Sequence, residues 1–324
     1  MIIEFSELKK AFSGAVDFIE KNGCLCPRRF TKKQFDHFVD TENYIHKLWK
    51  GKSCSGMDID FYTDSEYLKL DTFCYTASSQ SYCYFDVYVD GKHHYSCGYD
   101  AAENTDFEVF TKLPSGYKRV TVYLPCLFGV DIKSFELSEN SGFEPYKKTR
   151  KLLFLGDSIT QGYTAEHPSL TYTSIVSRGL NAEGVNHGIG ANVFNDKDLD
   201  PDLPYSPDII FVAFGTNDWT HNRDIKTESQ KYLSELIKIY PHSKIYVILP
   251  IWRGRLSEHE AKTTVTFSEM HDILKCACED FAKVRIIDGR DLVPNDPKLF
   301  RPDTTHPNEN GFNYYGNELL KAIE

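Results

Sequence analysis

The sequence predicts an α/β protein of two domains, in which a sheet-rich domain precedes a parallel sheet covered by helices. The length is the first indication, since 324 residues exceed the usual size of one domain, about 100–200 residues. The second is a change of pattern: short alternating strands fill residues 57–137, whereas apolar strands separated by helical stretches follow residue 150. The third is the composition, because 41% hydrophobic and 14% aromatic residues favour folded cores.

The first twenty residues show the spacing of an amphipathic helix. Apolar residues recur every three or four positions and stop before Asn22-Gly23, which fits a C-terminal cap. These residues are Phe5, Leu8, Phe12, Val16 and Ile19. We therefore expect a helix to open the chain.

Short strands with alternating polarity follow from Met57 to Leu137. They read MDIDFY, YLKLD, YFDVYV, KHHYSCGY, YKRVTVYLP and VDIKSFEL, with a turn at Asp90-Gly91 between the third and the fourth. Strands at this spacing predict a β-sandwich or jelly roll. The polar stretch SENSGFEPYKKTR, residues 138–150, then indicates a domain boundary. We place the N-terminal helix and β-sandwich in residues 1–147 and the second domain in residues 148–324.

The second domain alternates strands with helices. The strands read KLLFLG, GVNHGIG, PDIIFVAFG, KIYVILP and VRIIDG. Helical stripes are formed by Leu233, Leu236, Ile237 and Tyr240; by Phe267, Ile273, Leu274, Cys278 and Phe281; and by Phe312, Tyr315, Leu319 and Ile323. A parallel sheet of five strands with crossover helices fits a flavodoxin-like three-layer αβα fold.

Charge and composition exclude several classes of partner. A net charge of −10 opposes nucleic acid and anionic membrane surfaces, and no run of apolar residues reaches the roughly 20 that span a bilayer. The start lacks the basic and small-residue features of a secretory signal, so we expect a cytoplasmic protein. The nine cysteines have no disulfide framework and fit reduced thiols. The pairs CLC and CAC fit core packing better than a zinc site.

One stretch, FLGDSITQG, places Ser158 where an apolar strand ends and a helix begins. Open α/β sheets hold their sites at this edge, so Ser158 is a candidate nucleophile. The alternative is that Ser158 only caps the helix that follows.

Three further stretches end on the same predicted edge: NHGIGAN from Asn186, GTND from Gly215, and DTTHP from Asp303. Asp303 and His306 lie three residues apart in a tight loop, and Pro307 fits the first position of the last helix. Asp303 is then able to accept from Nδ1–H of the imidazole, which leaves Nε2 to take a serine proton. An N-capping Asp and a surface His are the alternative.

Acyl transfer also needs donors for the oxyanion. The candidates are the N–H of Ser158, an N–H in the turn around Gly190 and Ala191, and the side-chain amide of Asn217. For Asn217 the alternative is an Asx-turn or helix cap. The loop PIWRGR, residues 250–255, follows the fourth strand and is a candidate wall of the pocket, or ordinary loop packing.

The four ordered blocks GDSIT, NHGIGAN, GTND and D-x-x-H-P resemble those of the GDSL or SGNH hydrolases over about 170 residues. The resemblance implies Ser158 as nucleophile, Asn217 as oxyanion donor, and Asp303 with His306 completing a triad. Family members often carry Asn-x-x-x-x-Gly in the second block, where this chain has Ala191, so either Gly190 or Ala191 supplies the N–H.

The N-terminal half resembles the small β-sandwich of family-two carbohydrate esterases, on the stretches CSGMDIDFYTDSEYLKL and GYKRVTVYLP. The two resemblances imply a serine esterase that removes O-acetyl groups from a sugar or glycoside and needs no metal or other cofactor. The alternatives are a thioesterase or short-chain lipase on the same fold, and a non-catalytic glycan-binding protein. Tyrosines of this half are candidates for stacking on sugars, or for cross-strand pairs and core. They are Tyr82, Tyr84, Tyr88, Tyr95 and Tyr99. The oligomeric state is not indicated.

Overall fold

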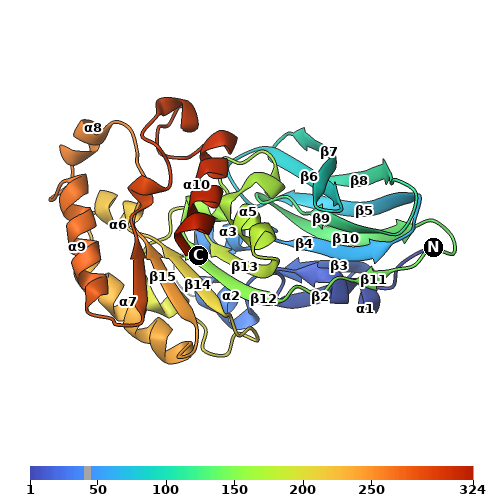
Figure 1. The fold of residues 1–324 in the computed structure, drawn as a ribbon, viewed down its shortest axis with the longest axis horizontal. Coiled ribbons are helices and arrows are strands. Elements are labelled where there is room, and N and C mark those ends of the chain that lie inside the picture. Colours follow the sequence, from blue (N-terminus) through green and yellow to red (C-terminus); the bar gives the residue numbers. More distant parts are fainter. Residues whose placement is uncertain (40–44, 324) are drawn as a thin grey trace.

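The computed structural model describes residues 1–39 and 45–323. Two antiparallel sheets fill the N-terminal part, and a parallel sheet with helices on both faces fills the C-terminal part (Figure 1). The fold class predicted from the sequence is therefore confirmed.

The first antiparallel sheet has the order β1-β4-β9-β6-β7, and β11 pairs with β4. Its strands are β1 (Phe12–Ser13), β4 (Asp58–Thr63), β6 (Tyr82–Val89), β7 (Lys92–Asp100), β9 (Lys118–Tyr123) and β11 (Glu144–Pro145). The hairpin between β6 and β7 turns at Asp90 (φ 48°) and Gly91 (φ 76°), as the Asp-Gly pair predicts.

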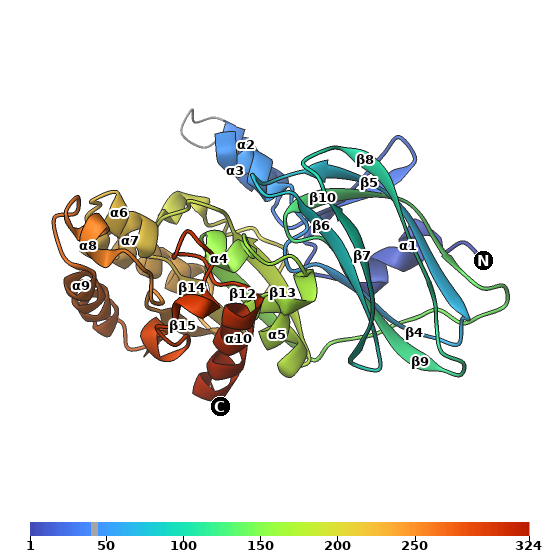
Figure 2. The same ribbon diagram turned by 90° about the horizontal axis from the view of Figure 1, so that it is seen from above.

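The second antiparallel sheet has the order β2-β3-β10-β5-β8. Its strands are β2 (Asp17–Lys21), β3 (Cys24–Arg28), β5 (Tyr67–Thr76), β8 (Thr105–Lys112) and β10 (Phe128–Leu137). Side chains from both sheets, among them Phe61, Val122, Leu70 and Phe135, belong to one buried cluster, and Figure 2 shows the two sheets facing each other. The N-terminal part is thus a sandwich, as predicted.

The predicted N-terminal helix is wrong beyond its first turns. The chain forms α1 (Phe5–Leu8) and a 3₁₀ turn, and then enters β1 and β2. Asn22 (φ 53°) and Gly23 (φ 74°) form the turn of the β2–β3 hairpin and do not cap a helix. The helical spacing misleads because β2 is an edge strand whose side chains are mostly exposed, so burial does not impose the alternation of a strand.

Two helices between β3 and β4 are absent from the expectation. They are α2 (Lys32–Val39) and α3 (Ile45–Gly51), which Figure 2 shows standing between the two parts of the molecule. They contact the C-terminal part: Gln34 Nε2 donates to the Asp198 carbonyl at 3.0 Å, and Lys47 Nζ lies 2.6 Å from the Asp198 carboxylate. A segment early in the chain thus packs against the C-terminal part, which contains the parallel sheet.

The parallel sheet has the order β13-β12-β14-β15-β16, which in chain order is 2-1-3-4-5, the flavodoxin-like arrangement. Its strands are β12 (Arg150–Gly156), β13 (Ala182–Gly188), β14 (Ile209–Ala213), β15 (Lys244–Ile248) and β16 (Val284–Ile287). The helices are α4 (Ser158–Gln161), α5 (Tyr172–Gly179), α6 (Thr216–Thr220), α7 (Ile225–Ile239), α8 (Leu256–Glu260), α9 (Phe267–Glu279) and α10 (Glu309–Ile323). Short 3₁₀ turns are η1 (Lys9–Ala11), η3 (Pro168–Leu170), η4 (Asp196–Asp198), η5 (Gly289–Asp291) and η6 (Pro297–Leu299).

Alternate side chains of β12 point to opposite faces of this sheet and join different cores. Leu152 and Phe154 belong to the cluster that includes residues of α5 and α10. Leu153 and Leu155 belong to the cluster that includes residues of α7 and α9. The predicted helical stripes are confirmed on α7, α9 and α10, although Tyr240 lies just after α7 ends and Phe281 just after α9 ends.

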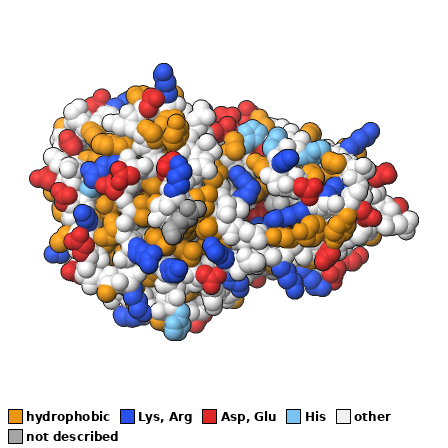
Figure 3. Space-filling model, in the orientation of Figure 1, with side chains coloured by type: hydrophobic (Ala, Val, Ile, Leu, Met, Phe, Trp, Pro, Cys, Tyr) orange, Lys and Arg blue, Asp and Glu red, His pale blue; other side chains and the backbone are white. Residues whose placement is uncertain are grey.

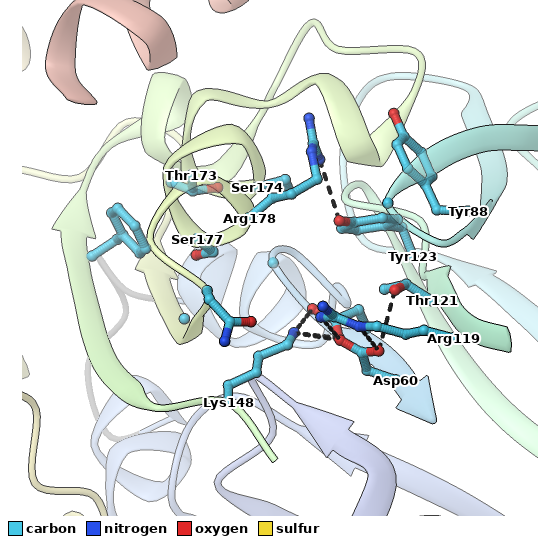
Figure 4. Close-up of a pocket in the computed structure, with 16 residues that line it drawn as sticks. Asp60, Tyr88, Arg119, Thr121, Tyr123, Lys148, Thr173, Ser174, Ser177 and Arg178 are labelled. Atoms are coloured by element: carbon cyan, nitrogen blue, oxygen red, sulfur yellow. Dashed lines mark hydrogen bonds and ion pairs between the residues drawn. The ribbon is translucent and has the colours of Figure 1, made fainter. Parts of the chain in front are cut away.

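The two parts meet at a small polar cavity of about 50 Å³. Figure 4 shows Lys148 reaching toward Asp60 and Arg119, while Arg178 of α5 reaches Tyr123 of β9. Lys148 Nζ is buried and lies 2.6 Å from Asp58, so the predicted linker also carries part of the interface. Because β11 still pairs with β4 and β12 begins at Arg150, the boundary between residues 147 and 148 is compatible with this arrangement and stays a prediction.

Charges of both signs are interspersed over the face seen in Figure 3. The net charge of −10 is therefore not collected into one surface there. Within the described residues, no helix is both long and apolar enough to cross a membrane.

Candidate active site

Ser158 stands at the first position of α4, two residues after the end of β12, an inner strand of the parallel sheet. Gly156 makes the sharp exit from the strand, because a Cβ there would lie 2.0 Å from Thr160 Oγ1. The helix cap is Asp157, whose carboxylate accepts from the Ile159 N–H at 3.0 Å. The capping role considered for Ser158 thus belongs to its neighbour, and the Ser158 hydroxyl is left for another contact.

That contact is with His306. Ser158 Oγ lies 2.8 Å from His306 Nε2, and His306 Nδ1 lies 2.7 Å from Asp303 Oδ2. A carboxylate only accepts, so Nδ1 carries the proton and Nε2 accepts from the serine hydroxyl. The structure brings the three residues together in the order that the sequence predicted.

The loop that carries this pair, residues 301–307, is called the His306 loop below. Asp303 Oδ1 also accepts from the backbone N–H groups of Thr305 (2.9 Å) and His306 (3.0 Å). The expected position of Pro307 is wrong: it forms a β-bridge with Phe300, and α10 begins at Glu309. The loop needs an extended residue to close it, and Asn308 Oδ1 accepts from the Gly311 N–H at the start of the helix.

The candidate oxyanion donors come from three strand ends. Asn217, in the first turn of α6 after β14, donates from Nδ2 to the Asn192 carbonyl at 2.9 Å, which fixes its amide and leaves one N–H. The N–H of Ser158, at the start of α4, has no acceptor within the described part of the chain. Both residues line the same cavity.

The third donor comes from the loop after β13, residues 188–192, called the Ala191 loop below. The Gly190 N–H is already used, since it donates to Gln161 Oε1 at 2.8 Å. Ala191 lies in the left-handed region at φ 66°, lines the cavity, and has an N–H without an acceptor among the described residues. Of the two candidates left open by the sequence, the geometry therefore favours Ala191.

The cavity beside Ser158 has a volume of about 450 Å³ and is open to solvent. Most of its lining residues have polar side chains, although carbon atoms form the larger share of the exposed surface. The residues that line it are Lys50, Ser79, Asp157, Ser158, Ile159, Tyr163, Gly190, Ala191, Thr216, Asn217, Thr220, Arg253, His259, Thr305 and His306. The cavity is large enough for a small ester substrate.

Residues 154–313 match the family model described as GDSL-like Lipase/Acylhydrolase family. This region of the chain belongs to that family. The matched residues include Ser158, Asn217, Asp303 and His306. No curated protein matches the chain.

Solved structures resemble the whole chain at low sequence identity. A salicylyl-acyltransferase, SsfX3, from a tetracycline biosynthetic pathway has a TM-score of 0.84 and 20% identity over 96% of this chain and 93% of that chain. A GDSL-like lipase from Bacteroides ovatus ATCC 8483 has a TM-score of 0.79 and 17% identity over 100% of this chain and 96% of that chain. A family two carbohydrate esterase from Clostridium thermocellum, solved with cellohexaose, has a TM-score of 0.63 and 17% identity over 83% of this chain and 92% of that chain. These likenesses show a shared fold.

The GDSL-like domain receives support from the N-terminal part that the sequence did not reveal. Arg29 is fully buried and makes five hydrogen bonds, two of them at 2.7 Å to the Asn186 and Gly188 carbonyls at the end of β13. Lys50 Nζ donates to the Gly190 carbonyl at 3.0 Å. The Ala191 loop is therefore held from outside its own domain. No local motif marks Arg29, because its acceptors are backbone carbonyls and a serine hydroxyl at Lys50, Ser53, Asn186 and Gly188, the last two of them 157 and 159 residues away along the chain.

In the PIWRGR loop one side chain packs in the protein interior and another lines the cavity. Trp252 packs against the cores and donates from Nε1 to the Arg290 carbonyl at 3.1 Å. Arg253 lines the cavity, and its Nη2 contacts His259 Nε2 at 2.8 Å and Thr305 Oγ1 at 3.1 Å. Only the arginine contributes to the pocket wall.

The pKa values of the two carboxyl groups of the site, Asp157 and Asp303, are shifted in opposite directions. Burial raises the pKa of Asp157 to about 6. For Asp303 burial acts in the same direction, but the hydrogen bonds from His306 and Thr305 outweigh it and hold the pKa well below its ordinary value. Asp303 thus stays ionised and keeps the imidazole oriented.

The remaining sequence candidates lie outside this site. Cysteines of the described chain are free thiols, and Cys278 is buried on α9 as predicted. Among described residues, no three His, Cys, Asp or Glu side chains gather to hold a metal ion. None of the five predicted tyrosines lines the described cavity, where the aromatic ring is that of Tyr163, 4.8 Å from the His306 ring.

Proposed function

We propose that this chain is a serine esterase that cleaves small acyl esters through an acyl-enzyme, and that its substrate is an O-acetylated carbohydrate or glycoside. The observation that carries the proposal is the continuous hydrogen-bonded series of Ser158, His306 and Asp303 at the wall of an open cavity. Membership of the GDSL-like lipase/acylhydrolase family supports it.

In the proposed reaction Ser158 Oγ attacks the ester carbonyl carbon while its proton moves to His306 Nε2. The carbonyl oxygen becomes an oxyanion. When the C–O bond to the alcohol breaks, His306 gives this proton to the departing alcohol oxygen. Water then attacks the acyl-serine, with its proton taken by His306, and the acid leaves as Ser158 recovers its proton.

The oxyanion would accept from the N–H groups of Ser158 and Ala191 and from the free amide hydrogen of Asn217. Donors that are fixed before the reaction stabilise this charge without reorganising, and each contributes about 10²–10³ in rate. The contact between Asn217 Nδ2 and the Asn192 carbonyl supplies such fixation.

The pocket favours a small, polar substrate over a long acyl chain. Most of its lining residues carry charged, amide or hydroxyl groups that are able to bind sugar hydroxyls, while the apolar surface comes from Ile159, Tyr163 and the carbon atoms of the polar side chains. A thioesterase or lipase for long chains would need an extended apolar groove beside Ser158. The N-terminal part contributes Ser79 and Lys50 to the lining, so both parts of the chain are positioned to meet a sugar.

The test is hydrolysis of 4-nitrophenyl acetate by the purified protein and by Ser158→Ala. We expect the substitution to lower kcat by about 10³-fold or more, because it removes the nucleophile. Ser257→Ala, at an exposed serine of α8 outside the cavity, should retain the parent rate. Equal rates for Ser158→Ala and the parent would exclude the proposal. Rates on acetylated xylo-oligosaccharide, acetyl-CoA and a decanoyl ester then separate the substrate classes.

A further inference from the structure

Arg253 is a buried cation in the wall of the cavity. The residue is only 8% exposed, and its Nε–H is buried without an acceptor among the described residues. Its Nη2 contacts the neutral partners His259 and Thr305, and its guanidinium lies 5.5 Å from the Trp219 ring. The charges of Asp303 and Asp157 act on it from a distance, but no described carboxylate lies within the 4.0 Å of an ion pair. A buried charge is costly unless it is paired, so this guanidinium is suited to an anion that the protein itself does not provide.

A second cation faces the same cavity from the N-terminal part. Lys50 Nζ donates to the Gly190 carbonyl, and no described carboxylate lies within 4.0 Å of it. The nearby carboxylates have other partners: Asp157 caps α4, and Asp303 accepts from His306. The cavity therefore holds two cations against one lining carboxylate, Asp157.

The position of Arg253 indicates which half of an ester it would meet. Its Nη2 donates to Thr305 Oγ1, next to His306 in the His306 loop. In the proposed reaction His306 protonates the departing alcohol, so the alcohol half lies on this side. The oxyanion donors come from Ser158, Ala191 and Asn217.

We infer that the substrate carries a negatively charged group, a carboxylate or a phosphate, on its alcohol half, and that Arg253 binds this group. The inference rests on the proposed esterase function and narrows its substrate to esters of acidic alcohols, such as acylated acidic sugars. The planar fork of a guanidinium matches both oxyacids, and Nη1 of Arg253 makes no hydrogen bond to the described residues, whereas Nη2 is used by His259 and Thr305.

The test compares acetyl esters that differ in charge on the alcohol half: 4-acetoxybenzoate, 4-acetoxyphenyl phosphate and the neutral 4-acetoxybenzamide. We expect the parent protein to prefer at least one anionic ester. In Arg253→Gln the ratio of kcat/KM for that ester to kcat/KM for 4-acetoxybenzamide should fall by about 10–100-fold, as expected for a lost charge-assisted hydrogen bond. The two anionic esters distinguish a carboxylate from a phosphate.

Arg255→Gln is the matched control, since it removes the same charge from an exposed position two residues away that does not line the cavity. Its ratio should equal that of the parent. Ratios unchanged in Arg253→Gln overturn the inference, while loss of all hydrolysis in Ser158→Ala still supports the esterase. A parent protein that hydrolyses none of the three esters overturns the esterase proposal and this inference with it.

Discussion

The two loops that face each other across Ser158 are built in different ways. The His306 loop is closed by its own residues: Asp303 binds the side chain and N–H of His306, three positions on, and Arg301 N–H donates to the His306 carbonyl at 2.9 Å. The Ala191 loop is held by distant residues. Arg29 binds the carbonyls of Asn186 and Gly188 where the loop begins, Lys50 binds the Gly190 carbonyl, and Gln161 binds the Gly190 N–H.

This difference shows which parts of a site a sequence motif records. When a loop is closed by contacts between residues three positions apart, its functional residues all lie in one short stretch of sequence, here DTTHP. The Ala191 loop is fixed by contacts that span 29 to 159 residues, so the only local signal in its own sequence is its glycines. The triad side is thus a local unit, whereas the oxyanion side depends on how the N-terminal segment packs.

Breaking the local unit should have the largest effect. Asp303→Asn keeps the size of the side chain but removes the negative charge that orients Nδ1–H of His306. We expect kcat on 4-nitrophenyl acetate to fall by on the order of 10⁴-fold, with little change in the fold. Steady-state kinetics and circular dichroism measure the two quantities.

The same substitution has a predictable pH dependence. The pKa of Asp303 is depressed in the folded protein, so its contribution to the free energy of unfolding is present above its unfolded pKa, about 3.8, and is lost as the pH falls below that value. Asp303→Asn should therefore be less stable than the parent at pH 7, and the difference should begin to shrink below about pH 4 while most of it persists at pH 3, because the folded pKa lies well below that of the unfolded chain. A difference in stability that grows as the pH falls would contradict this account.

Breaking the long-range support should act on stability and rate together. Arg29→Met leaves the Asn186 and Gly188 carbonyls buried without their donors, which we expect to lower the free energy of unfolding by about 3 kcal/mol. Because the Ala191 loop then loses its support, kcat/KM should fall by about 10–100-fold. Urea unfolding and esterase kinetics test both expectations.

Arg28→Met is the matched control for this prediction. Arg28 is the preceding residue, and its Nη1 contacts the Pro27 carbonyl and Tyr75 Oη within the N-terminal sandwich. It should leave kcat/KM unchanged. If both variants had equal kinetics, the Ala191 loop would not depend on Arg29.

The features of the fold that the sequence predicted are those that local sequence patterns determine, and the features that it missed depend on packing between distant residues. The parallel sheet and its order could be predicted because β12, β14 and β15 are apolar runs that bury both faces. The start of the chain could not, because β2 is exposed at an edge and Phe5 to Ile19 happen to repeat at helical spacing. The pair Asn22-Gly23 held the missed signal, since Asn-Gly favours a hairpin turn.

Within the site, the residues Ser158, Asp303 and His306 could be singled out because each stands in a short motif at a strand end. The choice between Gly190 and Ala191 could not be made, since it depends on Gln161 occupying the Gly190 N–H. Arg253 could be predicted only as part of the loop PIWRGR, without a sign of which side chain faces the pocket. Its burial without a carboxylate is a property of the packed structure.

The smallest effect concerns the backbone of the Ala191 loop. Ala191 has φ 66°, a conformation that disfavours a side chain by about 1–2 kcal/mol, while glycine carries an entropic penalty of about 0.4–1 kcal/mol in the unfolded chain. Ala191→Gly should therefore raise the free energy of unfolding by up to about 1 kcal/mol. Ala261→Gly, at an exposed position with φ −63°, should lower it by about 0.5 kcal/mol. Opposite signs in urea unfolding would show that the loop holds Ala191 in a strained conformation, and a loss of stability in both variants would show that it does not.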